Sequence, residues 1–344
     1  MIRAFSPRDI ARLRRRQVSG ASLDLEGRIL SGRSPLQHAI GTLWPGRRHP
    51  YHTWLLEPVD GSFPGGCAQA RRRRDTTEAD LTFIAPALST GPRAVLSWQR
   101  LLPEACQGLA ACGVTSIFAA IDADEPVALQ VLRRLGFADL AHETVYRLAA
   151  PHPIEPAEPI ATRAPQPSDG PALDRLARSG LASVDRAGSQ AGEWDRHPLG
   201  GQHALRGHSR VWIGSGSELL GAWRLCEGSA GRWLSCLTAE GAGAATLVGA
   251  ALAAAGTGAQ PLFAAARSDQ AALHDALRAR GFEPFVDRIV LVKHNALRVI
   301  EPAWREQQTL EGSMEAAPSR FSPPLAAQVD PSDARPGVPG PSGA

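Results

Sequence analysis

The sequence has 344 residues, of which 43% are hydrophobic and 21% are charged, and its formal net charge is only +3. This length exceeds one small hydrophobic core and suits two domains of ordinary size. So weak a net charge gives no indication of a nucleic-acid partner. No apolar segment reaches the length that crosses a membrane, and the Arg-rich start has no apolar stretch of a signal peptide. We therefore expect a cytoplasmic protein whose partners are neither nucleic acid nor a membrane.

In chain order, the first expected elements are a strand at residues 2–5 and a helix at 7–16. Ser6 and Pro7 form a helix-start pattern, because a serine oxygen accepts a backbone N–H and proline has none to leave unpaired. A second helix is expected at 34–43. The elements that follow are strands at 54–57, 66–71 and 79–85, a helix at 93–112 ended by Gly113, and a buried strand at 114–121.

The next pattern, an amphipathic helix followed by glycine, phenylalanine and a strand, occurs twice. Residues 122–137 end in Gly136 and Phe137, and residues 267–282 end in Gly281 and Phe282. Glycine suits the left-handed conformation that ends a helix. The beginning also recurs at 160–176, where Ser168 is the expected cap. A repeat of this length predicts two copies of one α/β unit.

Between the copies, alternating prolines at 149–159 predict an extended linker. The second copy is expected to contain strands at 209–213, 219–226, 232–237 and 261–265 and a helix at 242–255. We predict domains at 1–148 and 160–301. The remaining 302–344, rich in Pro, Gly and Ala, is predicted to be disordered.

Several side-chain clusters allow more than one interpretation. The run Arg71–Arg74 is either a solvated strand end or a contact for phosphate or an acidic substrate. The tryptophans at 194, 212, 223 and 233 either pack in a core or line a pocket. The five cysteines are odd in number and lack zinc-site spacing, so we expect reduced thiols. The histidines show no metal spacing either, and no metal is predicted.

The order strand, helices, three strands, helix, strand, helix, strand, present twice, resembles the GNAT acetyltransferase superfamily. Over both halves the chain is similar to a tandem GNAT protein. The resemblance implies a mixed α/β fold with two GNAT-like acyl-CoA N-acyltransferase domains. It also implies that acetyl-CoA is the co-substrate and that an acetyl group passes to a small-molecule or peptide amine, which attacks the thioester directly.

The resemblance also assigns the cofactor loop. In the family, backbone N–H groups at a helix start hold the pyrophosphate in a Gln/Arg-x-x-Gly-x-Gly/Ala loop, where orphan donors and the helix dipole favour an anion. In the second unit Thr238 stands where Gln or Arg is expected. The matching residues there are Gly241, Ala242, Gly243 and Ala244. Weaker matches in the first unit are Ser89, Thr90, Gly91 and Arg93, because Pro92 has no N–H. The alternative is that these glycines only shape a turn.

The catalytic residues of the family are only partly matched. Leu132 and Leu277 stand where many members have a tyrosine acid, and leucine cannot donate a proton. Glu125 and Gln270 stand where an asparagine is common. The candidate bases on central strands, each of which is alternatively a solvated strand-end carboxylate, are Glu57, Glu78, Asp80 and Glu227. The chain is therefore an N-acetyltransferase, a catalytically degenerate GNAT-like binding or regulatory protein, or a combination of one functional and one structural half.

Overall fold

The computed structural model describes residues 1–43, 49–58, 65–73, 76–150, 160–178, 207–216, 218–239 and 241–295. The predicted tail at 302–344 and most of the predicted linker, residues 151–159, lie outside these ranges, as do Arg74 and Trp194. The domain boundaries predicted at 1–148 and 160–301 stay a prediction. Below, these two parts are called the first and the second unit.

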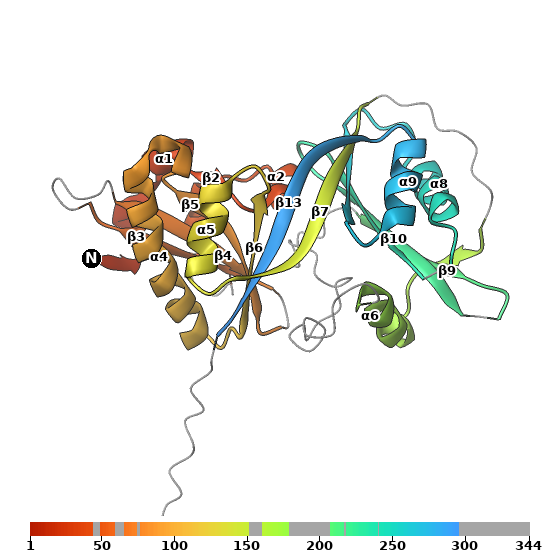
Figure 1. Ribbon diagram of the computed structural model, residues 1–344, viewed down its shortest axis with the longest axis horizontal. Coiled ribbons are helices and arrows are strands. Elements are labelled where there is room, and N and C mark those ends of the chain that lie inside the picture. Colours follow the sequence, from red (N-terminus) through yellow and green to blue (C-terminus); the bar gives the residue numbers. More distant parts are fainter. Residues whose placement is uncertain are drawn as a thin grey trace, which may run out of the picture. The chain divides into compact units, whose positions relative to one another are not determined.

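Apart from β2, α2 and α3, which have no counterpart among the described residues, the two units follow the same order of elements (Figure 1). The first unit contains β1 (Ile2–Ala4), α1 (Ile10–Arg16), β2 (Ala21–Ser22), α2 (Leu25–Ser31), α3 (Pro35–Gly41), β3 (Tyr51–Leu56), β4 (Gly66–Arg72), β5 (Glu78–Ala85), α4 (Pro92–Ala111), β6 (Ser116–Asp122), α5 (Pro126–Arg134) and β7 (Ala138–Leu148). The second contains β8 (Thr162–Arg163), α6 (Gly170–Arg178), β9 (Gly207–Ile213), β10 (Leu219–Glu227), β11 (Arg232–Thr238), α8 (Ala244–Ala255), β12 (Leu262–Arg267), α9 (Ala271–Ala279) and β13 (Glu283–His294). The sequence prediction missed β2 and α2.

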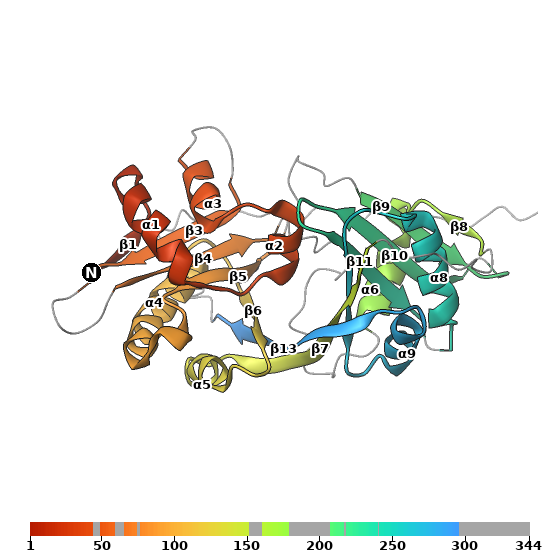
Figure 2. The same cartoon turned by 90° about the horizontal axis from the view of Figure 1, so that it is seen from above.

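The two units exchange their last strands. The sheet order is β1-β3-β4-β5-β6-β13-β7-β12-β11-β10-β9-β8, so β13 lies between β6 and β7, and β7 lies between β13 and β12 (Figures 1 and 2). Both exchanges have the same register: Lys293 pairs with Ile117, and Leu148 pairs with Leu262. Where β7 and β13 cross, Glu143 pairs with Arg288. Because of this exchange, residues Met1–Arg298, which include both units, are joined by their contacts into one compact region.

Each unit has its own main apolar core, and α2 takes part in a further cluster. In the first unit α4 and α5 pack on the strands around Trp98 and Leu132, on the face opposite α1 and α3 (Figure 2). In the second unit α8 and α9 pack around Leu247 and Leu277. Three residues of α2, an element of the first unit, instead pack against Trp233 and Phe263 of the second unit. Helix α2 therefore joins the two units on the other face of the sheet.

The repeated helix ends are as predicted. Gly136 (φ 86°) and Gly281 (φ 79°) follow α5 and α9 in the left-handed region, which glycine adopts at low cost. Phe137 and Phe282, which come next, are each 3% exposed.

The repeated helix starts differ from the prediction in one respect. The equivalent acids are Asp9 and Asp169, which accept bidentate hydrogen bonds of 2.6–2.7 Å from Arg3 and Arg163. Ser168 is therefore not the cap: it lies inside the turn Pro167–Asp169, and Gln166 occupies the cap position. The repeated signal is Arg-Ala, then proline and aspartate at fixed spacing, rather than a serine.

The arginine run after β4 belongs to a buried ion network. Arg71 donates to Asp24 at 2.7 Å and to Asp80 at 2.9 Å. Arg73 also donates to Asp80, and to Glu78 at 2.8 Å. Burial alone would raise the pKa of Asp80, but the charges of Arg73 and Arg71 outweigh it and lower that pKa to about 2. Asp80 is therefore held as a carboxylate.

This network corrects the interpretation of the run Arg71–Arg74 as a solvated strand end for Arg71 and Arg73. Within that run, Arg71 is 4% exposed and only Arg72 is exposed among the residues described. The alternative of a phosphate contact is equally disfavoured for Arg71 and Arg73, because their guanidiniums already bind carboxylates. A buried charge is tolerated only when it is paired, so these ion pairs explain the burial.

All five cysteines are free, as predicted. Burial raises the pKa of Cys67 to about 12 and that of Cys106 to about 11, so these thiols are protonated at neutral pH. Within the described ranges no helix is both long enough and apolar enough to cross a membrane.

The strand exchange predicts that the first unit is unstable alone. In a fragment of residues 1–148, β7 loses both of its neighbours, β13 and β12, and β6 keeps only its three residue pairs with β5. We expect this fragment to lack a cooperative thermal transition by circular dichroism, and co-expression with residues 149–344 to yield a one-to-one complex by size-exclusion chromatography. A fragment 1–148 that melts cooperatively at the temperature of the full chain would contradict the exchange.

The ion network predicts a strong effect of Asp80→Asn. We expect a loss of about 3–5 kcal/mol in the free energy of unfolding at pH 7, because two buried arginines lose a partner. The pKa of Asp80 is lower in the folded chain than in the unfolded chain, so its stabilisation is complete above about pH 5 and is lost as the pH falls towards 2.

The check is urea denaturation of wild type and Asp80→Asn at pH 7 and pH 3. The control is Asp139→Asn, which removes the exposed ion pair with Arg133 and should cost at most about 1 kcal/mol. Equal losses for both variants would show that the network contributes no more than a surface pair.

Candidate functional site

In each unit, two parallel strands pair only at their beginnings. β5 pairs with β6 from Glu78 to Asp80, although β5 continues to Ala85. β11 pairs with β12 from Arg232 to Leu234, although β11 continues to Thr238. Beyond these three residue pairs the facing edges are not hydrogen-bonded to each other. An edge of this kind can pair with an extended ligand.

In the first unit, this edge of β5 is occupied by the chain itself. β4 pairs along the opposite edge of β5, so β2 lies on the edge that faces β6. Leu23 N donates to Thr82 O at 2.9 Å, and Ala87 N donates to Ser19 O at 2.6 Å. The segment comes so close that a Cβ at Gly20 would lie 2.0 Å from Phe83 Cζ. The first unit therefore closes its own edge.

In the second unit, no strand among the described residues pairs with β11 beyond Leu234 on the side of β12. Helix α8 begins just after β11, with Gly243 at the cap position. Thr246 N and Leu247 N donate to Gly243 O, each at 3.1 Å. The N–H groups of Ala244 and Ala245 precede them, and the first N–H groups of a helix have no acceptor within it. Among the described residues, an edge of β11 without a strand partner thus occurs together with helix-start N–H groups that have no acceptor within the helix.

The four predicted cofactor residues of the second unit lie together in this turn, but they do not offer equal donors. Ala242 N donates to Ala239 O at 3.1 Å, so that N–H is already used. Gly241 has φ 79°, and Gly243 has φ −69°. Gly241 is therefore a turn residue that favours glycine, whereas other residues can adopt the backbone conformation of Gly243.

The weaker set in the first unit lies at the start of α4. Ser89 and Thr90 form a turn before the helix, and the Thr90 hydroxyl donates to Ala87 O at 2.6 Å. Gly91 caps α4 at φ 120°, and Arg93 is exposed in the first turn. The structure brings these residues together, next to the edge that β2 occupies.

The four predicted bases lie apart from the open edge of β11. Glu57 follows β3 and forms ion pairs with Arg3 at 3.3 Å and Arg12 at 3.7 Å. Glu78 and Asp80 belong to the arginine network. Glu227 is exposed and pairs with Arg232 at the opposite end of β11.

Of the four positions where the resemblance places a tyrosine or an asparagine, Leu132, Leu277 and Gln270 are structural here, and Glu125 is exposed at the start of α5. Leu132 and Leu277 are 0% exposed in the two cores. The Gln270 side chain accepts a hydrogen bond from Arg267 N at 2.9 Å. No group of three or more acidic, histidine or cysteine side chains within the described ranges is suited to hold a metal ion.

One carboxyl that the sequence prediction missed is Glu26, half-buried on α2. Burial, and then the charge of Asp24, raise its pKa to about 8 against the opposing effect of Arg71. Burial and then the charge of Glu26 raise the pKa of Cys226, on β10, to about 12. Asp24 followed by Leu25, Ile29 and Leu30 at helical spacing is the signal that would have revealed α2.

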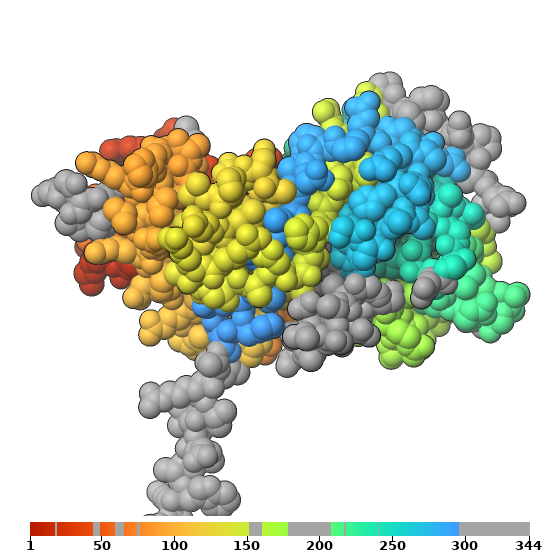
Figure 3. Space-filling model, viewed as in Figure 1, coloured from red at the N-terminus to blue at the C-terminus, as the bar shows by residue number. Residues whose placement is uncertain are grey.

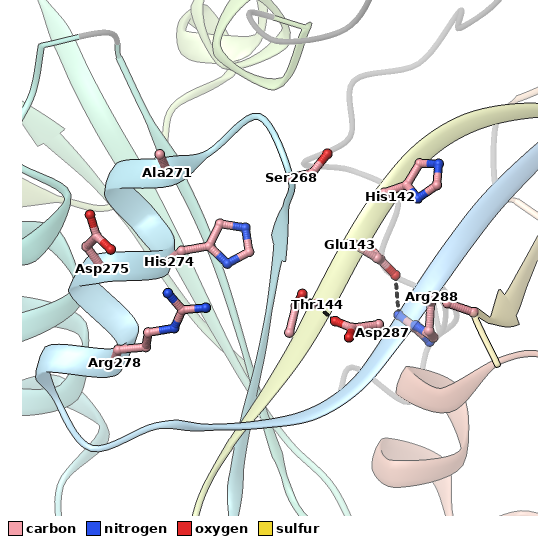
Figure 4. A pocket seen from close by; sticks show the side chains of 11 residues that line it. His142, Glu143, Thr144, Ser268, Ala271, His274, Asp275, Arg278, Asp287 and Arg288 are labelled. Atoms are coloured by element: carbon pink, nitrogen blue, oxygen red, sulfur yellow. Dashed lines mark hydrogen bonds and ion pairs between the residues drawn. The ribbon is translucent and has the colours of Figure 1, made fainter.

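A cavity of about 430 Å³ lies between α9 and the exchanged strands (Figure 4). Figure 3, drawn from the same side as Figure 1, shows the surfaces of α5 and α9 on either side of the exchanged strands β7 and β13. The cavity is lined mainly by polar side chains, namely His142, Glu143, Thr144, Ser268, His274, Asp275, Arg278, Asp287 and Arg288, with Ala123 and Ala271. The sequence does not reveal this cavity, because its residues come from four separate segments.

No family model and no curated protein matches this sequence. Solved structures do match. A GCN5-related N-acetyltransferase from Sphaerobacter thermophilus is 15% identical over 86% of this chain and 95% of its own, with a TM-score of 0.48. A putative acetyltransferase from Pyrococcus horikoshii is 12% identical over 86% of this chain and 90% of its own, with a TM-score of 0.47.

A tandem GNAT protein from the clavulanic acid biosynthesis pathway matches at 13% identity, over 86% of this chain and 98% of its own, with a TM-score of 0.49. These likenesses concern the fold alone. The chain is a mixed α/β protein that resembles GNAT acetyltransferases over both units, as its order of elements predicted.

Proposed function

We propose that the second unit binds acyl-CoA at the open edge of β11 and the start of α8, and that the chain is an N-acyltransferase that transfers an acetyl group to an amine. The observation that carries this proposal is the difference between the units. The edge of β5 is hydrogen-bonded to β2, whereas the corresponding edge of β11 has no strand partner among the described residues.

The chemistry of acyl-CoA suits these two features. Its pantetheine arm contains amide groups that can pair with an open strand edge, as an added strand does. Its pyrophosphate can accept hydrogen bonds from the N–H groups of Gly243, Ala244 and Ala245, where the helix dipole favours negative charge. Glycine at 243 lets the phosphate approach the backbone closely.

In the proposed reaction the amine attacks the thioester carbonyl, and the thiolate of CoA leaves. The amine must first lose a proton, and we propose Glu26 as the group that accepts it. The charge of Glu26 acts on Cys226 of β10 and is itself acted on by Glu143 of β7, and β11 and β12 lie between those two strands. A carboxyl with a pKa of about 8 is a stronger base than an ordinary carboxylate.

The alternative is a catalytically degenerate GNAT-like protein that binds a ligand or a regulator without acyl transfer. Leu277 favours it, because it leaves no side-chain acid at the position where the family has tyrosine. A thiolate is a good leaving group, so the missing acid weakens catalysis without preventing it. Measurement of acetyl-CoA binding tests the two alternatives, because only the acetyltransferase requires this co-substrate.

The proposal predicts that Gly243→Val removes acetyl-CoA binding. The backbone at Gly243 tolerates a side chain, and a new Cβ would meet Thr246 Oγ1 at 3.1 Å, so the fold should persist while the added bulk blocks the phosphate. We expect the dissociation constant to rise at least about hundredfold, which corresponds to about 2.7 kcal/mol. Isothermal titration calorimetry provides the measurement.

The matched control is Gly170→Val, the same change at the start of α6, where a Cβ has open space. Arg93→Gln tests the first unit and should leave the affinity unchanged. Unaltered affinity of Gly243→Val would reject this site, and no binding by wild type would support the degenerate alternative.

The assignment of Glu26 predicts a change in the pH profile. Wild-type turnover should rise with pH and level off above about pH 8, where the carboxylate form dominates. Glu26→Gln should lower kcat by about 100-fold and remove this rise. Acetyl-CoA consumption would be followed with a panel of primary amines, with Glu227→Gln as control. If the pH profile of Glu26→Gln keeps the wild-type shape, whatever its absolute rate, Glu26 is excluded as the base.

A further inference from the structure

The duplication provides an internal comparison for the cavity at α9. Because Gly281 is the equivalent of Gly136, His274 corresponds to Leu129 and Tyr146 corresponds to Leu291. In the core around α5, Leu129 and Leu291 are 5% and 0% exposed and belong to the same apolar cluster. In the core around α9, Tyr146 Oη donates to His274 Nδ1 at 2.7 Å, and His274 Nε2 donates to Arg267 O at 2.8 Å. The fold therefore does not require a polar pair at this place.

The same comparison applies to an arginine one turn further along each helix. Arg133 of α5 forms a bidentate ion pair with Asp139 at 2.9 and 2.6 Å. Its equivalent in α9 is Arg278, and Pro284 occupies the position of Asp139. Among the described residues Arg278 has no carboxylate partner, and its Cζ lies 5.9 Å from the centre of the Tyr146 ring. The guanidinium of Arg278 thus remains available in the cavity.

The opposite wall carries a carboxylate that is likewise unpaired. Asp287 Oδ1 accepts a hydrogen bond from the neutral Thr144 hydroxyl at 2.6 Å and forms no ion pair within the described part of the chain. Glu143 and Arg288, beside it, pair with each other. Figure 4 shows Arg278 on α9 and Asp287 on β13, with Thr144 and His274 between them. One positive and one negative group therefore face the same cavity of about 430 Å³.

We propose that this cavity binds an α-amino acid, with its carboxylate on Arg278 and its ammonium group on Asp287. A zwitterion satisfies both charges at once, which neither a simple anion nor a simple cation does. Planar guanidinium suits bidentate recognition of a carboxylate. The site is distinct from the proposed acyl-CoA site, because β12 separates β7 from β11 in the sheet. His142 and Asp275 also line the cavity and are available to contact the ligand's side chain.

The test is calorimetric titration of the full chain with each of the twenty common L-amino acids. We expect at least one to bind saturably with a dissociation constant below about 1 mM. Its decarboxylated amine and its deaminated acid should each bind at least about tenfold more weakly, since each lacks one charge-assisted contact. Absence of saturable binding for all twenty would overturn the proposal, and so would equal binding of the amine.

Variants test the two contacts separately. Arg278→Gln and Asp287→Asn should each weaken the best amino acid at least about tenfold. Arg133→Gln, the same change at the equivalent position of α5, should have no effect on affinity. A double change of Tyr146 and His274 to leucine restores the first-unit pattern and should reduce binding while a cooperative thermal transition remains. Full affinity of Arg278→Gln would overturn the assignment.

Discussion

The hydrogen bonds between β7 and β13 are the constraint on which the rest of this molecule depends. Through them each unit completes its sheet with a strand of the other, and both exchanges have one register. The same crossing places α9 beside β7, which creates the cavity. It also gives Glu26 of α2 access to strands of the second unit. Neither feature exists in a single unit considered alone.

Duplication relaxes the demand on each copy, and the two units have diverged at equivalent positions. The edge of β5 is satisfied by β2, which makes the first unit a closed scaffold. The corresponding edge of β11 has no strand partner among the described residues, and the core around α9 has a hydrogen-bonded tyrosine and histidine where the core around α5 has two leucines. The Tyr146 hydroxyl is buried and would cost stability without a partner, and the half-buried His274 provides that partner.

Some elements of this structure could be predicted because neighbouring residues in the sequence determine them. Gly136 and Gly281 were found because only glycine adopts the left-handed helix end cheaply. Most strands and long helices follow from periodicity. The exchange of β7 and β13 could not be predicted, since no local pattern specifies which strand a given strand will pair with.

Much of the site could not be predicted either, because its contacts join segments that are far apart in the sequence. The turn at Gly243 was predicted from its glycines, but β2 is too short to have a pattern, and Tyr146 lies far along the chain from His274. Arg71 and Arg73 look like surface charges, because the carboxylates that allow their burial come from other elements. Helix α2 was missed, and Glu26 with it.

The pair of Glu143 and Arg288 has a consequence for assembly. These residues occupy equivalent positions of the two units, so they face each other where the local pseudo-twofold axis crosses the sheet. At such a place two copies of the first unit would bring glutamate against glutamate, and two copies of the second would bring arginine against arginine. Like charges at this depth repel strongly, whereas the mixed pair attracts. Strand β7 is thereby biased towards a β13 and away from a second β7, which disfavours pairing between identical central strands of two molecules.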